Sequence, residues 1–293
     1  MDLATLSGAT TIALASTIVF LLIVRSWQLV SQTAISTSRF PDSIMHEAAQ
    51  RFRDQLETLS RQQTIYLSAA LVFMMIFAVA YTFPPQGMFE ELPRWQLILV
   101  LVLFAAAAIY TPYRLLRIIL KKRYLGFVRD ANIATGHALQ KLNANQNRLY
   151  HDVPTDAGII DNVVVGQHGI YAVHVVPVKP RKDNEVSLRG DRLTFSDKKV
   201  MSVARVGVKS AQLAKEIGKV LGHNIRVRSV VVVPGWEVDS QASEAYLAVN
   251  ERNLTMLTGW KDPNDYLMNE DVDTVQNMLS ERCRRYKKTK KGD

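Results

Sequence analysis

Long apolar stretches dominate the first 113 residues of the chain. The stretch from Leu3 to Val24 has twenty-two residues without a charge, and Ile65 to Phe83 and Trp95 to Tyr113 have nineteen each. A helix needs about 20 predominantly apolar residues to cross a bilayer. The pattern predicts three transmembrane helices within a membrane domain of residues 1–123. Only Asp2 precedes the first stretch, so it lacks the basic start of a signal peptide and is expected to be retained.

Basic residues near the predicted spans give an expected orientation, because Lys and Arg favour the cytoplasmic side. Five arginines lie between the first two spans, whereas Arg94 stands beside Glu90 and Glu91 before the third. The third span is followed by Arg114, Arg117, Lys121, Lys122 and Arg123. We therefore expect a multi-pass protein of a bacterial inner membrane, with the N-terminus outside, the C-terminal domain cytosolic, and these cations at the lipid surface.

An amphipathic pattern fills the segment between the first two spans. Met45, Ala48, Phe52, Leu56 and Leu59 recur at steps of three and four residues, with charges on the other face. This spacing predicts a helix over about 42–63 that continues into the second span. Its apolar stripe would pack on the protein's own domain or on the helix after the third span. A partner subunit and the lipid surface are the alternatives.

The remaining sequence alternates helical and strand patterns. Helical spacing is found over 124–142, over 210–221 and again near 272–285. Strand patterns are "NVVVG", "GIYAVHVV", "RLTF", "RSVVVV" and "AYLAVN", with a tight turn from Gly166 to Gly169 joining the first two. This order predicts an α/β domain with a mixed sheet over 124–260, followed by a C-terminal helix and basic tail over 261–293.

The positive charge of the chain is concentrated outside this domain. The whole chain carries +9, but residues 124–281 hold 18 basic and 19 acidic residues, which makes the domain about neutral. The tail contributes Arg284, Arg285, Lys287 and Lys288, for which electrostatic attraction or solvated disorder are the two interpretations. A weaker candidate surface for nucleic acid or another anion consists of Lys179, Arg181, Lys182, Arg189, Arg192, Lys198 and Lys199. The single Cys283 excludes an internal disulfide and a cysteine metal cage.

The segment "IIDNVVVGQHGIYAV" resembles the nuclease-related domain, a bacterial branch of the restriction-endonuclease-like fold. Gln212 in "SAQLAKEI" is similar to the glutamine that opens the family's next helix. The Asn-Pro that the family has before this helix is replaced by Val208 and Lys209. The resemblance covers about residues 127–257 and implies a restriction-endonuclease-like sheet.

The resemblance also implies where a catalytic site would lie. The family holds a divalent metal between an early-helix Glu, a strand Asp and the Glu of a Glu-x-Lys motif. The corresponding positions here are His137 after Gly136, Asp161, His174 and, for the lysine, Val176. Only Asp161 keeps a carboxylate. The loss of the other catalytic groups argues against a magnesium nuclease, because removing one member of a catalytic set that acts as a unit already removes most of the activity. Lys179 or Lys182 would have to replace the missing cation.

Two interpretations of these positions are open. His137, Asp161 and His174 would form a ligand set better suited to Zn²⁺, Mn²⁺ or Fe²⁺ than to Mg²⁺. His174 would otherwise be an ordinary structural histidine, and no cofactor would be present. We expect a domain that has lost catalysis and works as an interaction or scaffolding module for a protein partner or a second copy. The alternatives are a nucleic-acid binder and a divergent metal-dependent nuclease.

Overall fold

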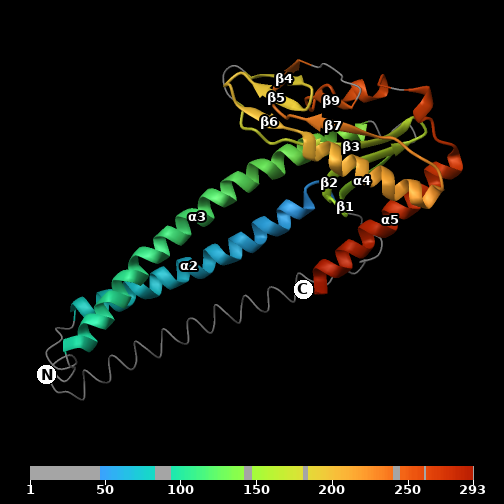
Figure 1. The fold of residues 1–293 in the computed structure, drawn as a ribbon. Helices are drawn as coiled ribbons and strands as arrows, with labels where there is room; N and C mark the ends of the chain where they lie inside the picture. The colour runs from blue at the N-terminus through green and yellow to red at the C-terminus, as the bar shows by residue number, and fades with distance from the viewer. Residues whose placement is uncertain are drawn as a thin grey trace. The chain divides into compact units, whose positions relative to one another are not determined.

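The computed structural model of the chain describes residues 47–82, 94–141, 147–180, 184–239, 245–260 and 262–292 (Figure 1). These residues divide into two compact units. One unit consists of residues 55–82 and 94–125. The other consists of residues 47–54 together with the described residues from 126 onward. The segment that carries Arg51 thus belongs to the same unit as the sheet.

Two long helices form the first unit and extend into the second. Helix α2 spans Gln50–Thr82 and helix α3 spans Arg94–Gln140. Within the first unit, Lys122 Nζ donates to Ser60 Oγ at 3.3 Å and to Gln63 Oε1 at 3.2 Å, which ties α3 to α2. Helix α2 continues through residue 63 as predicted. It begins at Gln50, so the predicted helix is wrong over residues 47–49, which form a turn, and residues 42–46 lie outside the described residues.

The prediction of three transmembrane helices is wrong for the part of the chain that the structure describes. No helix there is both long enough and apolar enough to cross a bilayer, which takes about 20 consecutive apolar residues. The multi-pass placement in an inner membrane, with its orientation, therefore loses its support. The first apolar stretch, Leu3 to Val24, lies outside the described residues.

The basic residues expected at a lipid surface have neighbours of their own in α3. Arg114 Nε donates to the Tyr110 hydroxyl at 2.9 Å, and the Arg117 guanidinium lies 4.9 Å from the centre of the Tyr113 ring. Lys121 and Arg123 are exposed. Arg114 and Arg117 thus each contact a tyrosine of the same helix.

A five-stranded mixed sheet forms the core of the second unit. Its strands are β1 (Arg148–Thr155), β2 (Gly158–Gly166), β3 (Gly169–Val175), β7 (Val227–Val232) and β9 (Tyr246–Val249), in the order β1-β2-β3-β7-β9. Neighbours β1, β2 and β3 are antiparallel, whereas β7 is parallel to β3 and to β9. The predicted mixed sheet and the predicted turn between Gly166 and Gly169 are confirmed.

A second sheet of four short strands packs beside the first. Its strands are β4 (Glu185–Arg189), β5 (Arg192–Phe195), β6 (Val200–Ser202) and β8 (Glu237–Asp239), in the order β6-β5-β4-β8. Phe195 and Trp236 are buried where this sheet meets Val231 and Ala248 of the main sheet. The Trp236 indole donates to Val178 O at 2.8 Å, so this tryptophan has a structural role.

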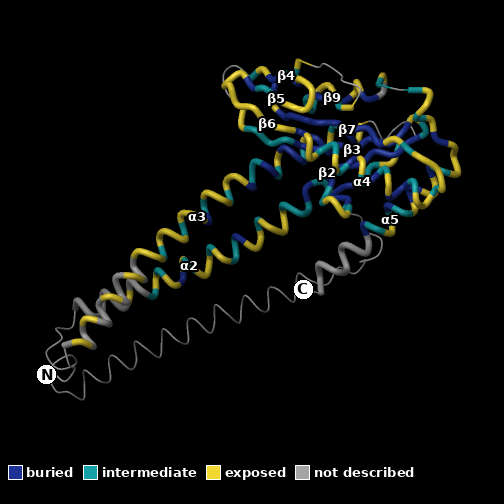
Figure 2. Tube along the Cα trace, in the orientation of Figure 1, coloured by how far each residue is buried: buried dark blue, intermediate teal, exposed yellow. Residues whose placement is uncertain are grey.

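Helices cover both faces of the main sheet. On one face lie α4 (Ala204–Leu221), through Leu213 and Ile217, and α5 (Asn269–Gly292), through Val275 and Leu279. The end of α3 and the short helix η2 (Leu254–Thr258) cover the other face; a second short helix, η3, spans Pro263–Asp265. Strands β3 and β7 are buried along their whole length (Figure 2). Polar side chains on these strands are therefore largely removed from water.

Candidate functional site

Asp161 on β2 is held by contacts from two other segments of the same unit. Its Oδ2 accepts a hydrogen bond from the backbone N–H of Val175 on β3 at 3.0 Å. Its Oδ1 accepts a hydrogen bond from the guanidinium of Arg51, also at 3.0 Å. Only 15% of the Asp161 side chain is exposed. The carboxylate is thus fixed in orientation and largely covered.

Arg51 contacts a second carboxylate as well. Its backbone N–H donates to Asp152 Oδ2 at 3.1 Å, and its Nε lies 3.8 Å from Asp152 Oδ1. Asp152 on β1 is buried and has a φ of 51°, a left-handed conformation that is uncommon for a residue other than glycine. One arginine in the first turn of α2 therefore partly neutralises two buried carboxylates on neighbouring strands. Sequence patterns gave no indication of Arg51 or Asp152.

Burial has the largest effect on the Asp161 carboxyl. It raises the pKa of Asp161, although the N–H of Val175 and the charge of Arg51 act in the opposite direction and offset part of the increase. The negative charge of Asp152 raises the pKa further. The cations near Asp161 consequently do not compensate fully for its removal from water.

His174 lies on β3 next to Asp161. It stands one position beyond the pair Asn162 and Val173 in the β2–β3 register, which puts it opposite Asp161. It is only 4% exposed, and its Nε2 has no hydrogen-bond partner among the described residues. Burial, and to a smaller extent the charge of Lys209, lower its pKa to about 3. The imidazole is neutral near pH 7 and is a weak base.

Lys209 on α4 supplies a second cation close to this group. Its Nζ donates to Ile159 O at 2.9 Å, and its charge acts on both Asp161 and His174. In the sequence, Lys209 stands out only as a departure from the family motif. Of the two lysines expected to replace the missing cation, Lys179 is exposed in the loop after β3, and Lys182 lies outside the described residues.

The three residues of the hypothetical metal set do not come together. His137 lies on the exposed side of α3 and lines a hollow with His151, whereas Asp161 and His174 belong to the cluster around Arg51. In the described ranges, no three His, Cys, Asp or Glu side chains are placed so that they could hold a metal ion. Val176, at the family's lysine position, packs against the smaller sheet.

Gln212 takes part in a separate network. Its Nε2 donates to Asp156 Oδ2 at 3.1 Å and to Glu216 Oε1 at 3.0 Å. Glu216 also accepts hydrogen bonds from the Asp156 N–H and from Arg282 on α5. These bonds join α4, α5 and the turn between β1 and β2, so Gln212 has a structural explanation.

The candidate anion-binding residues are only partly described. Lys179, Arg189, Arg192, Lys198 and Lys199 are exposed, and Arg192 lies 3.9 Å from the Asp191 carboxylate. Arg181, Lys182 and the side chains of Arg284, Arg285, Lys287 and Lys288 lie outside the described residues. The described cations therefore do not define a continuous binding surface by themselves.

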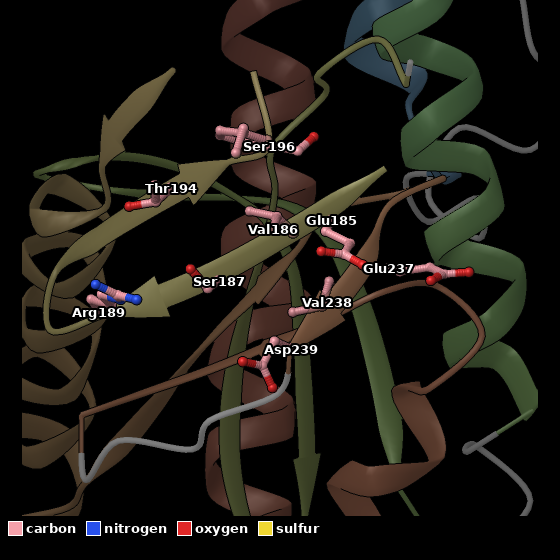
Figure 3. A pocket seen from close by; sticks show the side chains of 10 residues that line it. Glu185, Val186, Ser187, Arg189, Thr194, Ser196, Glu237, Val238 and Asp239 are labelled. Atoms are coloured by element: carbon pink, nitrogen blue, oxygen red, sulfur yellow. The ribbon is translucent and has the colours of Figure 1, made fainter. Parts of the chain in front are cut away.

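A hollow of about 520 Å³ lies over the smaller sheet (Figure 3). Glu185 and Glu237 stand opposite each other on β4 and β8, and Asp239 lies two residues further along β8. Directly opposed like charges destabilise a strand pair. Among the described residues, no set of acidic side chains or histidines here is placed to hold a metal ion.

Comparisons with protein-family models, with curated proteins and with solved structures find no match to this chain. The resemblance to nuclease-related domains therefore stays a prediction.

Proposed function

We propose that the α/β unit is a catalytically silent binding domain that works as an interaction or scaffolding module. The main support is the position of Arg51. Its guanidinium reaches both Asp161 and Asp152, where a hydrolytic site would need carboxylate oxygens available to a metal ion. A fixed +1 charge there opposes the binding of a divalent cation by electrostatic repulsion.

His174 and Lys209 also fit a silent domain. A neutral imidazole with a pKa of about 3 is too weak a base for efficient proton transfer near pH 7. Lys209 is engaged with Ile159 O, on the strand that carries Asp161. The cluster is therefore bonded within itself instead of presenting reactive groups to a substrate.

A nuclease assay on the full-length protein tests this proposal. Labelled DNA and RNA are incubated with the protein in Mg²⁺ or Mn²⁺, beside an Asp161→Asn variant of equal purity. We expect the wild type and the variant to leave the substrates equally intact. Cleavage by the wild type that disappears in Asp161→Asn would show a divergent nuclease instead.

The binding role has a separate test in the oligomeric state. A scaffolding module acts through a protein partner or through a second copy of itself, and sedimentation velocity over a hundredfold range of concentration detects self-association. A concentration-dependent increase in mass supports the second copy. A monomer at every concentration excludes a second copy as the partner, and the proposed partner is then a different protein.

Nucleic-acid binding is a second candidate because of the outer face of α4. Arg205, Lys215 and Lys219 are exposed there and form no ion pair with any described residue. Unpaired cations along one helix face are suited to phosphate contacts. Gel shifts at increasing salt test this candidate, since phosphate binding must weaken steeply as salt rises. Salt-independent retention would contradict it.

A further inference from the structure

A small cavity lies beside the Arg51 cluster, inside the same unit. Its volume is about 340 Å³, which is within the range of small-molecule sites. Three segments that are distant in the sequence line it: the start of α2, the end of α3, and β1. The space suits a small metabolite better than a nucleic-acid chain.

A close approach of two backbones shapes this cavity. A Cβ atom added to Gly136 on α3 would lie 2.6 Å from the Ala48 Cβ and 3.6 Å from His151 Cε1. Only glycine allows the segment before α2 to approach α3 so closely. The cavity is therefore part of how the segment carrying Arg51 is attached to the unit.

The donors on the polar walls are the guanidinium of Arg53, the amide of Gln140 and the imidazole of His137. The acceptors are the carboxylate of Glu47 and the Nε2 of His151. Arg53 Nη1 already donates to Glu47 Oε2 at 2.5 Å, which reduces the effect of that negative charge. An anion would be better accommodated by these side chains than a cation.

The deepest of these groups is held in a fixed orientation. His151 is buried, and its Nδ1 lies 2.6 Å from Asn162 Oδ1; a carbonyl oxygen only accepts, so Nδ1 carries the hydrogen. The Asn162 amide nitrogen, only 2% exposed as a residue, has no hydrogen-bond partner among the described residues. The bond to Asn162 fixes the ring of His151 in the cavity wall, with Nε2 as an acceptor.

We propose that this cavity binds a small molecule bearing a carboxylate or phosphate group. The bound anion would stabilise the contacts of Arg51 with Asp152 and Asp161. Glu47 and Arg53 lie on either side of Arg51 in the chain, and His151 directly precedes Asp152. A ligand that contacts Arg53 and His151 at the same time therefore keeps Arg51 next to the two carboxylates. This regulatory effect rests on the proposed silent function, whereas binding of the anion does not.

Calorimetric titration of the full-length protein with inorganic phosphate, and separately with malonate, tests the site at constant ionic strength. We expect saturable binding of at least one of them; which one binds tells a phosphate ligand from a carboxylate ligand. Arg53→Gln and Gln140→Ala should weaken it at least tenfold. Arg129→Gln should bind like the wild type, because Arg129 pairs with Asp130 on α3 and does not line the cavity.

Amide hydrogen exchange supplies a readout that needs no activity. The backbone N–H of Arg51 donates to Asp152, so its exchange should slow at least threefold when the anion is bound. Absence of saturable binding, or wild-type affinity in both cavity variants, would overturn the site. Binding without slower exchange at Arg51 would overturn the regulatory effect. Cleavage dependent on Asp161 would overturn the silent function and leave the binding result intact.

Discussion

Two arginine–carboxylate clusters in the α/β unit differ in how completely the carboxylate is satisfied. Glu216 on α4 accepts hydrogen bonds from Arg282, from the Asp156 N–H and from Gln212. Burial raises its pKa, but these three donors outweigh burial and lower the pKa overall. Asp161 has Arg51 and the Val175 N–H, and there burial outweighs the donors, so the pKa is raised.

Glu216 thus belongs to a structural ion pair, whereas Asp161 belongs to a cluster in which the charged form of the carboxyl is unfavourable. At Glu216 the folded state stabilises the ionised form, so the group contributes stability above its unfolded pKa of about 4.5, and that stability is lost as pH falls. At Asp161 the folded state favours the protonated form. Its ionisation costs stability as pH rises from about 3.8 through the raised pKa. Asp161 therefore opposes stability at neutral pH, where Glu216 supports it.

Arg282→Met should have the largest effect. It leaves Glu216 buried without its cation, which costs about 3 kcal/mol in the free energy of unfolding, at the lower limit for buried pairs because Arg282 is 28% exposed. Urea titration followed by tryptophan fluorescence measures the loss. Arg252→Met is the control, since Arg252 is 87% exposed and should change stability by less than about 0.5 kcal/mol. Equal losses in both variants would contradict a structural role for the Glu216 cluster.

His174→Leu should flatten the dependence of stability on pH. The unfolded imidazole takes up a proton near pH 6.5, whereas the folded one does so only near pH 3, so stability is complete above pH 6.5 and falls as pH decreases. Between pH 7 and pH 5 this loss amounts to about 2 kcal/mol. Urea titrations at both pH values measure it. His168→Gln, at an exposed histidine, should keep the wild-type dependence; an unchanged slope in His174→Leu would show that His174 is not buried as a neutral group.

Arg51→Met should destabilise the unit less than Arg282→Met does. The loss at pH 7 is expected to be about 1.5 kcal/mol, because the Arg51–Asp161 hydrogen bond is lost and the two carboxylates repel each other, while the raised pKa of Asp161 lets protonation limit the cost. Proton uptake by Asp161 relieves this repulsion, so the loss should shrink as pH falls toward 4.5. Urea titration at the two pH values, with Arg129→Met as control, measures the change. A loss that grows on acidification would reverse the sign assigned to Asp161.

Lys209→Met should have the smallest effect, about 1 kcal/mol, because it removes one hydrogen bond to a backbone oxygen. Loss of this cation should also raise the pKa of His174, since Lys209 contributes to lowering it. An NMR titration of the imidazole protons gives that pKa directly. A pKa at or below the wild-type value would place Lys209 too far away to act on His174.

The sequence predicted the elements with the clearest patterns. "GIYAVHVV" and "RSVVVV" correspond to β3 and β7, and the periodic stretch around Leu213 corresponds to α4. Strand β1 was missed, because "RLYHDVPT" has no apolar run and Asp152 interrupts its alternation with a left-handed φ. The "RLTF" strand was expected, but its place in a second sheet depends on pairing with β4 and β6 that alternation alone does not specify.

The site was only partly predictable for a similar reason. Asp161 and His174 follow from a local motif on two adjacent strands. Arg51 lies 110 positions before Asp161 in the chain, in a segment predicted only as an amphipathic helix, so no local pattern connects the two. The transmembrane prediction was wrong because it was based on apolar length in the sequence, whereas no helix among the described residues meets the requirement for crossing a bilayer.

A double-mutant cycle between Arg51 and Asp161 tests most directly the claim that this arginine neutralises that carboxylate. The free energy of unfolding is measured at pH 7 for the wild type, Arg51→Met, Asp161→Asn and the double variant. We predict a coupling free energy of at least about 1 kcal/mol, because Arg51→Met should cost much less once Asp161 carries no charge. A coupling of zero within error would contradict the account.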